Sequence, residues 1–288
     1  MRDWLALVRP VQWVKNGFVL APLVFSRRLL EPEAGFAALV AFAAFCLASS
    51  AAYVANDIAD RDRDRRHPLK RDRPLAAGRV DTWRAARLAA VLGAGAFALA
   101  AWLGWRFSAV VAAFVALQML YSAVLKEVVV ADVAAIATGF VLRAAGGVVA
   151  VGARMSGWLL LCTFLLAAVM ALGKRRHEAL LIGDDAHRHR EVLGRYTVAL
   201  LDRMIAAAAA ATLVAYGLYA WSPAVARKLG TERLYLTFPF VVFGLFRYLF
   251  LVYRRDAGGS PTDVLLGDAP LQAAIALWLG AVFFLLYR

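Results

Sequence analysis

AGFAALVAFAAFCLASSAAYVAN, residues 34–56, is an apolar stretch of 23 residues without a single charge. It is followed at once by DIADRDRDRRHPLKRDRPLAAGR, residues 57–79, in which acidic and basic residues alternate. About 20 consecutive apolar residues are enough for a helix to cross the hydrocarbon core of a bilayer. The two stretches together predict a transmembrane helix that ends in a highly charged loop.

The whole chain repeats this pattern of apolar segments separated by charged loops. Of its 288 residues, 62% are hydrophobic, and a mean hydropathy of +0.66 is too high for a soluble domain. We predict one all-α polytopic membrane domain over residues 1–288. We expect no removable signal peptide, because charged residues interrupt the first apolar positions. Nine transmembrane helices are predicted, at residues 12–30, 34–56, 82–104, 107–125, 130–152, 156–173, 198–221, 234–253 and 269–287.

Positive charge is distributed unevenly over the loops of this topology. The two most basic loops, 61–79 and 174–195, face the cytoplasm if the N-terminus does so too, in agreement with the positive-inside rule. The net charge of +13 therefore lies beside a membrane, where anionic lipids or phosphorylated substrates are expected partners rather than nucleic acid. Cys46 and Cys162 lie in apolar spans, where no cysteine chemistry is expected. We predict a multi-pass protein of the cell membrane with a cytoplasmic active site.

Asn56, Asp57, Asp60 and Asp64 are spaced three or four residues apart at the start of the first basic loop. Side chains at these spacings are neighbours on a helix, so their oxygen atoms can converge. Clustered carboxylates are unfavourable unless a cation neutralises them, and Mg²⁺ prefers oxygen ligands. We predict Asp57, Asp60 and Asp64 as catalytic metal ligands for Mg²⁺, with Asn56 as a substrate contact.

The rest of this loop supplies basic residues suited to phosphate. Lys70, Arg71 and Arg73 are predicted to bind a polyphosphate that the metal ion bridges. Asp62 and Asp72 fall off the face shared by the other carboxylates and are expected to be solvated. The alternative is that the alternating acids and bases of the whole loop only pair with one another and enforce topology.

A second basic cluster, GKRRHE at residues 173–178, follows the sixth predicted span on the same side of the membrane. Two loops on one side can close over one cavity, so Lys174 and Arg175 are predicted to bind the other end of a phosphorylated ligand. The spacing of His177, His187 and His189 is not that of a zinc enzyme. We therefore expect no metal at these histidines.

Four further polar residues lie in or beside the predicted spans. Tyr121 and Lys126 end the fourth span, and Asp132 and Arg143 lie within the fifth. A charge inside a span usually faces a polar cavity or an opposite charge, so partners on neighbouring spans and contact with substrate both remain open. Tyr121, Lys126 and Arg143 are included among the substrate-binding candidates, as is Lys15 near the membrane interface.

The spacing NDxxDxxxD at Asn56, Asp57, Asp60 and Asp64 resembles the first signature of the UbiA superfamily of intramembrane prenyltransferases. The likeness is greatest to the members that transfer phosphoribosyl groups, through RPVQWVKN at 9–16, the 56–78 loop, YSAVLKEVVVADVAAIATGFVLRAAGG at 121–147, and GKRRHE. Prenyltransferases of the superfamily carry a second acidic DxxxD motif where this chain has GKRRHE. Asp184 and Asp185 are nearby, but they are adjacent and lack that spacing.

The resemblance implies a UbiA-like bundle with a cytoplasmic active-site cavity. It also implies Mg²⁺-dependent transfer of 5-phosphoribosyl from phosphoribosyl pyrophosphate to decaprenyl phosphate or another polyprenyl phosphate. Pyrophosphate would be released, and the product would serve the synthesis of cell-wall arabinan. Arg9, Lys15 or Lys126 is expected to hold the phosphate of the acceptor at the membrane interface. One alternative is a prenyltransferase of the same fold with an aromatic acceptor, and another is a non-catalytic carrier of lipid phosphates. The oligomeric state stays open, a homo-oligomer included.

Overall fold

The computed structural model is all-helical and describes residues 2–66, 70–182, 196–254 and 259–288. Eight helical segments in these ranges are long and apolar enough to cross a membrane. Their positions confirm eight of the predicted spans, with ends that differ mostly by a few residues. They are α3 (Pro32–Ala59), α5 (Thr82–Leu103), α6 (Trp105–Ala123), α7 (Ala131–Ala150), α8 (Gly157–Ile182), α11 (Val198–Trp221), η4 with α13 (Arg233–Thr237 and Phe238–Arg254), and α15 (Ala269–Tyr287).

The first predicted span, residues 12–30, is not one continuous helix. After α1 (Arg2–Val8), the chain forms the 3₁₀ helix η1 (Pro10–Val19) and then the short helix α2 (Ala21–Phe25). Neither piece alone has the length of a spanning helix. The count of nine spans therefore stays a prediction.

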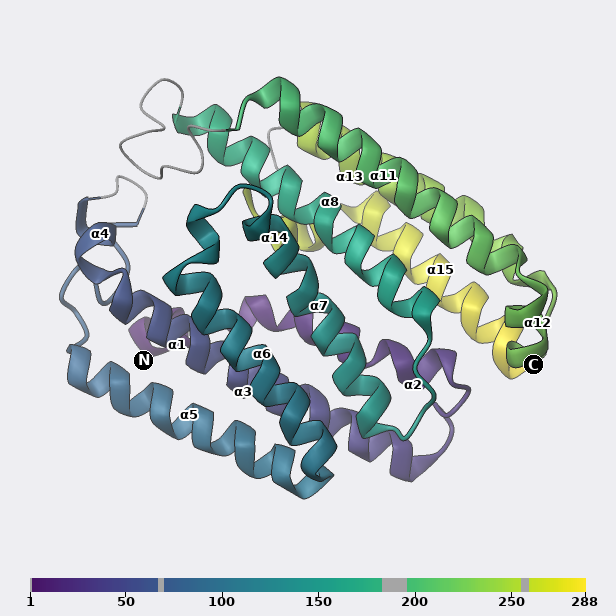
Figure 1. Ribbon diagram of the computed structural model, residues 1–288, viewed down its shortest axis with the longest axis horizontal. Helices are drawn as coiled ribbons and strands as arrows, with labels where there is room; N and C mark the ends of the chain where they lie inside the picture. The colour runs from purple at the N-terminus through teal and green to yellow at the C-terminus, as the bar shows by residue number, and fades with distance from the viewer. Residues whose placement is uncertain (1, 67–69, 183–195, 255–258) are drawn as a thin grey trace. The chain divides into compact units, whose positions relative to one another are not determined.

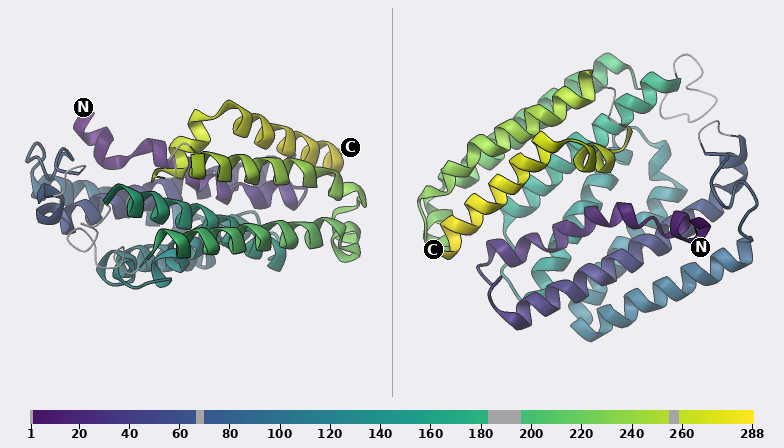
Figure 2. Two further views of the ribbon diagram at one scale, coloured as in Figure 1. Left: turned by 90° about the horizontal axis from the view of Figure 1, so that it is seen from above. Right: turned by 180° about the vertical axis from the view of Figure 1, so that it is seen from behind.

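Two polar side chains of η1 that contact α3 are three residues apart, which is one turn of a 3₁₀ helix. With three residues per turn, Trp13, Asn16 and Val19 lie on one face. The Trp13 indole donates to Ser50 Oγ at 3.0 Å, and the Asn16 amide donates to Cys46 Sγ at 3.2 Å. Both acceptors lie on α3, along which η1 runs in Figure 2. The side chains of this one face thus hold η1 against α3.

The chain divides into two compact units, which are described separately. The first comprises Met1–Leu23, Glu31–Leu125 and Leu142–Ala153, and the second comprises Val24–Leu30, Lys126–Val141 and Arg154–Arg288. In the first unit α3 packs against α5, α6 and η1 around Phe45, whose ring meets those of Phe107 and Phe114 edge-on. In the second unit α8 packs against α11 and α13 against α15.

Two of the helices are longer than a bilayer requires. At 1.5 Å per residue, the 28 residues of α3 and the 26 of α8 give lengths of about 42 and 39 Å, against a hydrocarbon core of about 30 Å. Because α8 continues to Ile182, the GKRRHE segment at residues 173–178, which was predicted to begin a loop, lies within this helix. Its residues are mostly straight-chain helix formers followed by Ala and Leu, so nothing in the sequence ends the helix at residue 173.

Large apolar side chains are exposed on several of these helices. Trp102 is 63% exposed and Trp105 is 76% exposed, and exposed Leu and Phe residues also occur on α11, α13 and α15. Exposed apolar surface on helices of spanning length is what a lipid environment requires. The protein is therefore an integral membrane protein.

Gly147 on α7 lets the backbone of η1 approach closely within the first unit. A Cβ atom added at Gly147 would lie 2.0 Å from the carbonyl oxygen of Val19. Because a backbone atom cannot move aside without shifting η1, we expect Gly147→Ala to destabilise the protein by about 1–3 kcal/mol. Thermal unfolding in detergent measures this loss. Gly157→Ala on α8, where an added Cβ meets nothing within 4 Å, is the matched control, and equal melting temperatures for the two variants would contradict the prediction.

Candidate active site

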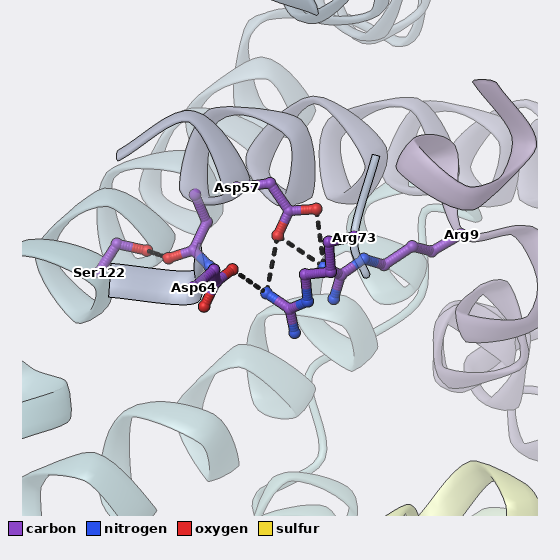
Figure 3. A network of polar contacts seen from close by, with 6 residues as sticks. Arg9, Asp57, Asp64, Arg73 and Ser122 are labelled. Carbon is purple, nitrogen blue, oxygen red and sulfur yellow. Dashed lines mark hydrogen bonds and ion pairs between the residues drawn. The ribbon is translucent and has the colours of Figure 1, made fainter. Parts of the chain in front are cut away.

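The buried carboxylate of Asp57 is the centre of an ionic network in the first unit (Figure 3). Asp57 lies in the last turn of α3. Its Oδ1 and Oδ2 accept hydrogen bonds from Arg9 Nη2 at 2.6 and 2.8 Å, and Oδ1 also accepts one from Arg73 Nη1 at 3.0 Å. Two guanidinium groups thus neutralise one buried carboxylate.

Arg73 connects Asp57 to a second buried carboxylate, that of Asp64. Asp64 lies on the short helix α4 (Arg61–Arg66), and its Oδ2 accepts a hydrogen bond from Arg73 Nη1 at 2.8 Å. Figure 3 shows the guanidinium of Arg73 between the two carboxylates. Asp57 and Asp64 thus lie close together in the structure, but on two helices, because the chain breaks between α3 and α4; their role as metal ligands stays a prediction.

The other two residues of the NDxxDxxxD motif lie beside this network. Asn56 Oδ1 accepts a hydrogen bond from Ser122 Oγ on α6 at 2.6 Å. Asp60 is half-buried and caps the C-terminus of α3, where its N–H donates to the carbonyl of Asn56 at 2.9 Å. Ser122 was not among the predicted site residues, and a serine in an apolar span gave no signal of this contact.

The ion pair of Arg9 with Asp57 is the largest addition that the structure makes to the predicted site. Arg9 joins α1 to η1 in the left-handed conformation, with φ 55° and ψ 58°, and its N–H donates to the carbonyl of Leu5 at 2.9 Å. Its guanidinium also lies 5.2 Å from the centre of the Tyr53 ring. The helix junction therefore delivers a cation to Asp57, and charge alone could not distinguish Arg9 from the other basic residues near the N-terminus.

The remaining predicted residues of the first unit differ in exposure. Lys15, Lys70 and Tyr121 are half-buried, and Arg71 is exposed. Arg143 is buried on α7, where its Nε donates to Asn16 Oδ1 at 2.7 Å and its guanidinium lies 4.6 Å from the centre of the Phe114 ring. Arg143 thus has protein partners in this structure.

The second unit holds a separate buried ionic network around Arg175. Arg175 and Asp132 are both fully buried, and Arg175 Nε donates to Asp132 Oδ2 at 2.5 Å. Arg175 Nη1 also pairs with Glu178 one turn along α8. Lys174, in contrast, is 42% exposed and lies 3.8 Å from Glu178. Of the two predicted phosphate ligands, Lys174 is the one whose side chain reaches the surface.

Tyr196 completes this network, although the sequence gave no sign of it. Its hydroxyl donates to Asp132 Oδ1 at 3.0 Å and accepts a hydrogen bond from the backbone N–H of Val130 at 2.6 Å. Burial raises the pKa of Tyr196 to about 12, so the hydroxyl keeps its proton near neutral pH. The two oxygens of Asp132 therefore each have a donor.

The structure describes no group of three His, Cys, Asp or Glu side chains placed to hold a metal ion in the residues it covers. The convergent carboxylates Asp57 and Asp64 are instead paired with arginine. His187, His189, Asp184 and Asp185 lie outside the described residues. His177 lies on α8 and packs against Gly259.

The fold and this network define a class of protein: a helical integral membrane protein with clustered carboxylates and arginines at the end of one spanning helix. The family model described as the UbiA prenyltransferase family matches residues 19–262. The chain therefore belongs to the UbiA prenyltransferase family.

Relatives with assigned names indicate which members of this family the chain resembles. The chain is 36% identical to the decaprenyl-phosphate phosphoribosyltransferase of Mycolicibacterium smegmatis, over 96% of this chain and 89% of that protein. It is 34% identical to the enzyme of the same name from Corynebacterium glutamicum, over 97% of this chain and 85% of the relative. A UbiA homolog from Archaeoglobus fulgidus, solved bound to DMAPP and Mg²⁺, shares the fold with a TM-score of 0.73, at 20% identity and with 99% of each chain covered.

Proposed function

We propose that this protein transfers 5-phosphoribosyl from phosphoribosyl pyrophosphate to decaprenyl phosphate and releases pyrophosphate. The observation that carries the proposal is the identity of 34–36%, over nearly the whole chain, to enzymes named decaprenyl-phosphate phosphoribosyltransferase. The product would be a precursor for cell-wall arabinan. The long lipid tail of the acceptor stays in the bilayer, which explains why the transfer of a water-soluble sugar needs a membrane enzyme.

The acidic network of the first unit fits a divalent cation. Arg73 Nη1 lies within 3.0 Å of oxygens from both Asp57 and Asp64, so two carboxylates already converge on one positively charged atom. Carboxylate oxygens are the ligands that Mg²⁺ takes together with substrate phosphate. We assign Asp57, Asp60 and Asp64 to hold this ion, which when bound would supply Lewis-acid stabilisation of the pyrophosphate leaving group.

The basic residues of the same loop are assigned to the pyrophosphate group of the donor. Arg73, Lys70 and Arg71 offer charged donors to its oxygens, and such donors stabilise the negative charge that develops as the C–O bond breaks. Asn56, fixed by Ser122, is assigned to orient the donor. Arg9 shares with Arg73 the neutralisation of Asp57.

The GKRRHE segment is assigned to the 5-phosphate of the donor. Lys174 is the contact residue, because its side chain is partly exposed. Arg175 is held by Asp132 and Glu178 and so fixes the part of α8 that carries Lys174. A phosphate at the far end of the donor explains why this segment is basic, where prenyltransferases of the superfamily have a second acidic motif.

The acceptor phosphate is anionic near neutral pH and needs no strong general base. Lys15, which lies within η1, and Lys126, which lies just after α6, are the candidates to bind it. Tyr121, near Lys126 in the chain, and Arg143 are assigned to complete the polar surroundings of the substrates. With these roles, each predicted substrate-binding residue has a proposed part in the reaction.

The proposed topology places the N-terminus and the active site at the cytoplasmic face of the cell membrane. Ten residues of η1 and five of α2 give a length of about 28 Å, close to the thickness of the hydrocarbon core. We therefore assign η1 with α2 as the first of nine crossings. Four spanning helices, α5 to α8, separate the two most basic loops, so these loops lie on one side. The first crossing then places the N-terminus, with Arg2 and Arg9, on that same side, as the positive-inside rule favours.

Purified protein in detergent or vesicles tests this function directly. Phosphoribosyl pyrophosphate labelled in the ribose, decaprenyl phosphate and Mg²⁺ should yield an organic-extractable label and an equal amount of pyrophosphate. Chelation with EDTA should stop the reaction, and added Mg²⁺ should restore it. A label that remains wholly aqueous would reject the proposal.

The two alternatives give different results in the same assay. A prenyltransferase would consume a prenyl diphosphate with an aromatic acceptor and leave phosphoribosyl pyrophosphate intact. A carrier of lipid phosphates would bind decaprenyl phosphate without any release of pyrophosphate.

A further inference from the structure

Val130 enters α7 in a backbone conformation that few non-glycine residues adopt. Its φ is +69°, which is strained for a β-branched residue. Its carbonyl accepts a hydrogen bond from Ala134 N–H at 2.9 Å and so starts α7, while its own N–H donates to the hydroxyl of Tyr196 at 2.6 Å. A side chain 66 residues further along the chain therefore holds this turn.

The hydroxyl of Tyr196 is itself fixed by buried charges. Tyr196 is 4% exposed, and it donates to Asp132, which Arg175 holds from α8. Asp132 lies two residues after Val130, so the backbone and the side chain of the same turn both bind Tyr196. All four residues belong to the second unit.

The turn held in this way carries Lys126. Lys126 lies in the 3₁₀ turn η2 (Leu125–Glu127), four residues before Val130, and it is 9% exposed. A buried lysine has little freedom to change rotamer, so the position of its ammonium group follows the backbone of its own turn.

We infer that Tyr196 is a positioning residue for the transfer reaction, acting through Val130 and the 126–130 turn on Lys126. The inference rests on the proposed function, in which Lys126 binds a phosphate group. The proposed function assigns the acceptor phosphate to Lys126; the donor also carries phosphate groups, and the experiment distinguishes the two substrates.

Tyr196→Phe removes the hydroxyl and keeps the ring. We expect the KM for one substrate to rise about tenfold, as the loss of a hydrogen bond to a fixed group suggests, while kcat changes less than twofold. The affected substrate, phosphoribosyl pyrophosphate or decaprenyl phosphate, should be the one whose KM rises in Lys126→Gln. In the Lys126→Gln background, Tyr196→Phe should add no further increase, because both changes act at one contact.

Tyr216→Phe is the matched control. Tyr216 is also buried in the second unit, and its hydroxyl bonds to Thr237 and Trp278, so its loss removes a comparable contact elsewhere. Its KM values should equal those of the unaltered protein. A merely structural role of Tyr196 would give equal effects for the two variants and would overturn the inference, as would independent effects of Tyr196→Phe and Lys126→Gln.

Amide hydrogen exchange supplies a readout that does not depend on activity. The Val130 amide should exchange at least tenfold faster in Tyr196→Phe than in Tyr216→Phe, because only the former loses its acceptor. Unchanged exchange would overturn the inference even if the enzyme is active. If the unaltered protein transfers no phosphoribosyl group, the proposed function fails separately.

Discussion

Asp60→Asn should lower kcat/KM for phosphoribosyl transfer by about a thousandfold, or ~4 kcal/mol of transition-state stabilisation. The change keeps the shape of the side chain and removes its charge, so it weakens the hold on a divalent cation without leaving a void. Asp60 caps α3 beside the Asp57 and Asp64 network and is only half-buried. Initial rates with labelled phosphoribosyl pyrophosphate, measured at several Mg²⁺ concentrations, give the result.

Asp62→Asn is the control for this substitution. Asp62 lies two residues further along, its side chain is 78% exposed, and its ion pairs with Arg61 and Arg65 are long, at 3.8 Å each. Exposed pairs of this kind contribute little to stability, so activity should stay within about twofold of the unaltered protein. Full activity in Asp60→Asn, with normal membrane insertion, would rule out its role as a metal ligand.

Arg175→Met should have the largest effect on folding. It leaves the fully buried Asp132 without its guanidinium partner, and an uncompensated buried charge costs about 3–5 kcal/mol. A cost of this size approaches the whole stability of many proteins. The melting temperature in detergent and the yield of monodisperse protein measure the loss.

Two companion variants distinguish charge burial from loss of packing. Asp132→Asn combined with Arg175→Met removes both charges and should recover much of the lost stability. Arg176→Met removes a pair with the partly exposed Asp202 and should destabilise the protein less than Arg175→Met does. Equal melting temperatures for Arg175→Met and Arg176→Met would refute the assigned importance of the buried pair.

Periodicity and charge predicted the helices well, for a physical reason. Uninterrupted apolar length is what a bilayer demands, and the ranges 198–221 and 269–287 agree with α11 and α15 to the residue. The predicted span 12–30 did not form one helix. Hydropathy measures composition, and it is blind to the three-residue spacing of Trp13, Asn16 and Val19 that favours a 3₁₀ helix.

The sequence pattern predicted the acidic residues of the candidate site, but it did not predict most of the side chains that bind them. The NDxxDxxxD spacing placed Asp57 and Asp64 together because the local chain geometry brings them close. The partners Arg9, Ser122 and Tyr196 are 48, 66 and 64 residues away from the side chains they bind, Asp57, Asn56 and Asp132. Contacts over such separations depend on how the helices pack, which the pattern along a single chain does not contain.

Because η1 is a 3₁₀ helix, the contacts of the N-terminal part of the protein depend more on the number of residues in η1 than on their identity. Deleting one residue between Trp13 and Asn16 would rotate everything on one side of the deletion by about 120° about the helix axis. Either Asn16 would then leave Cys46 and Ser49, or the junction that aims Arg9 at Asp57 would turn away from it. Substitutions at Val14 or Phe18, which lie between the contact positions, leave that angular alignment intact.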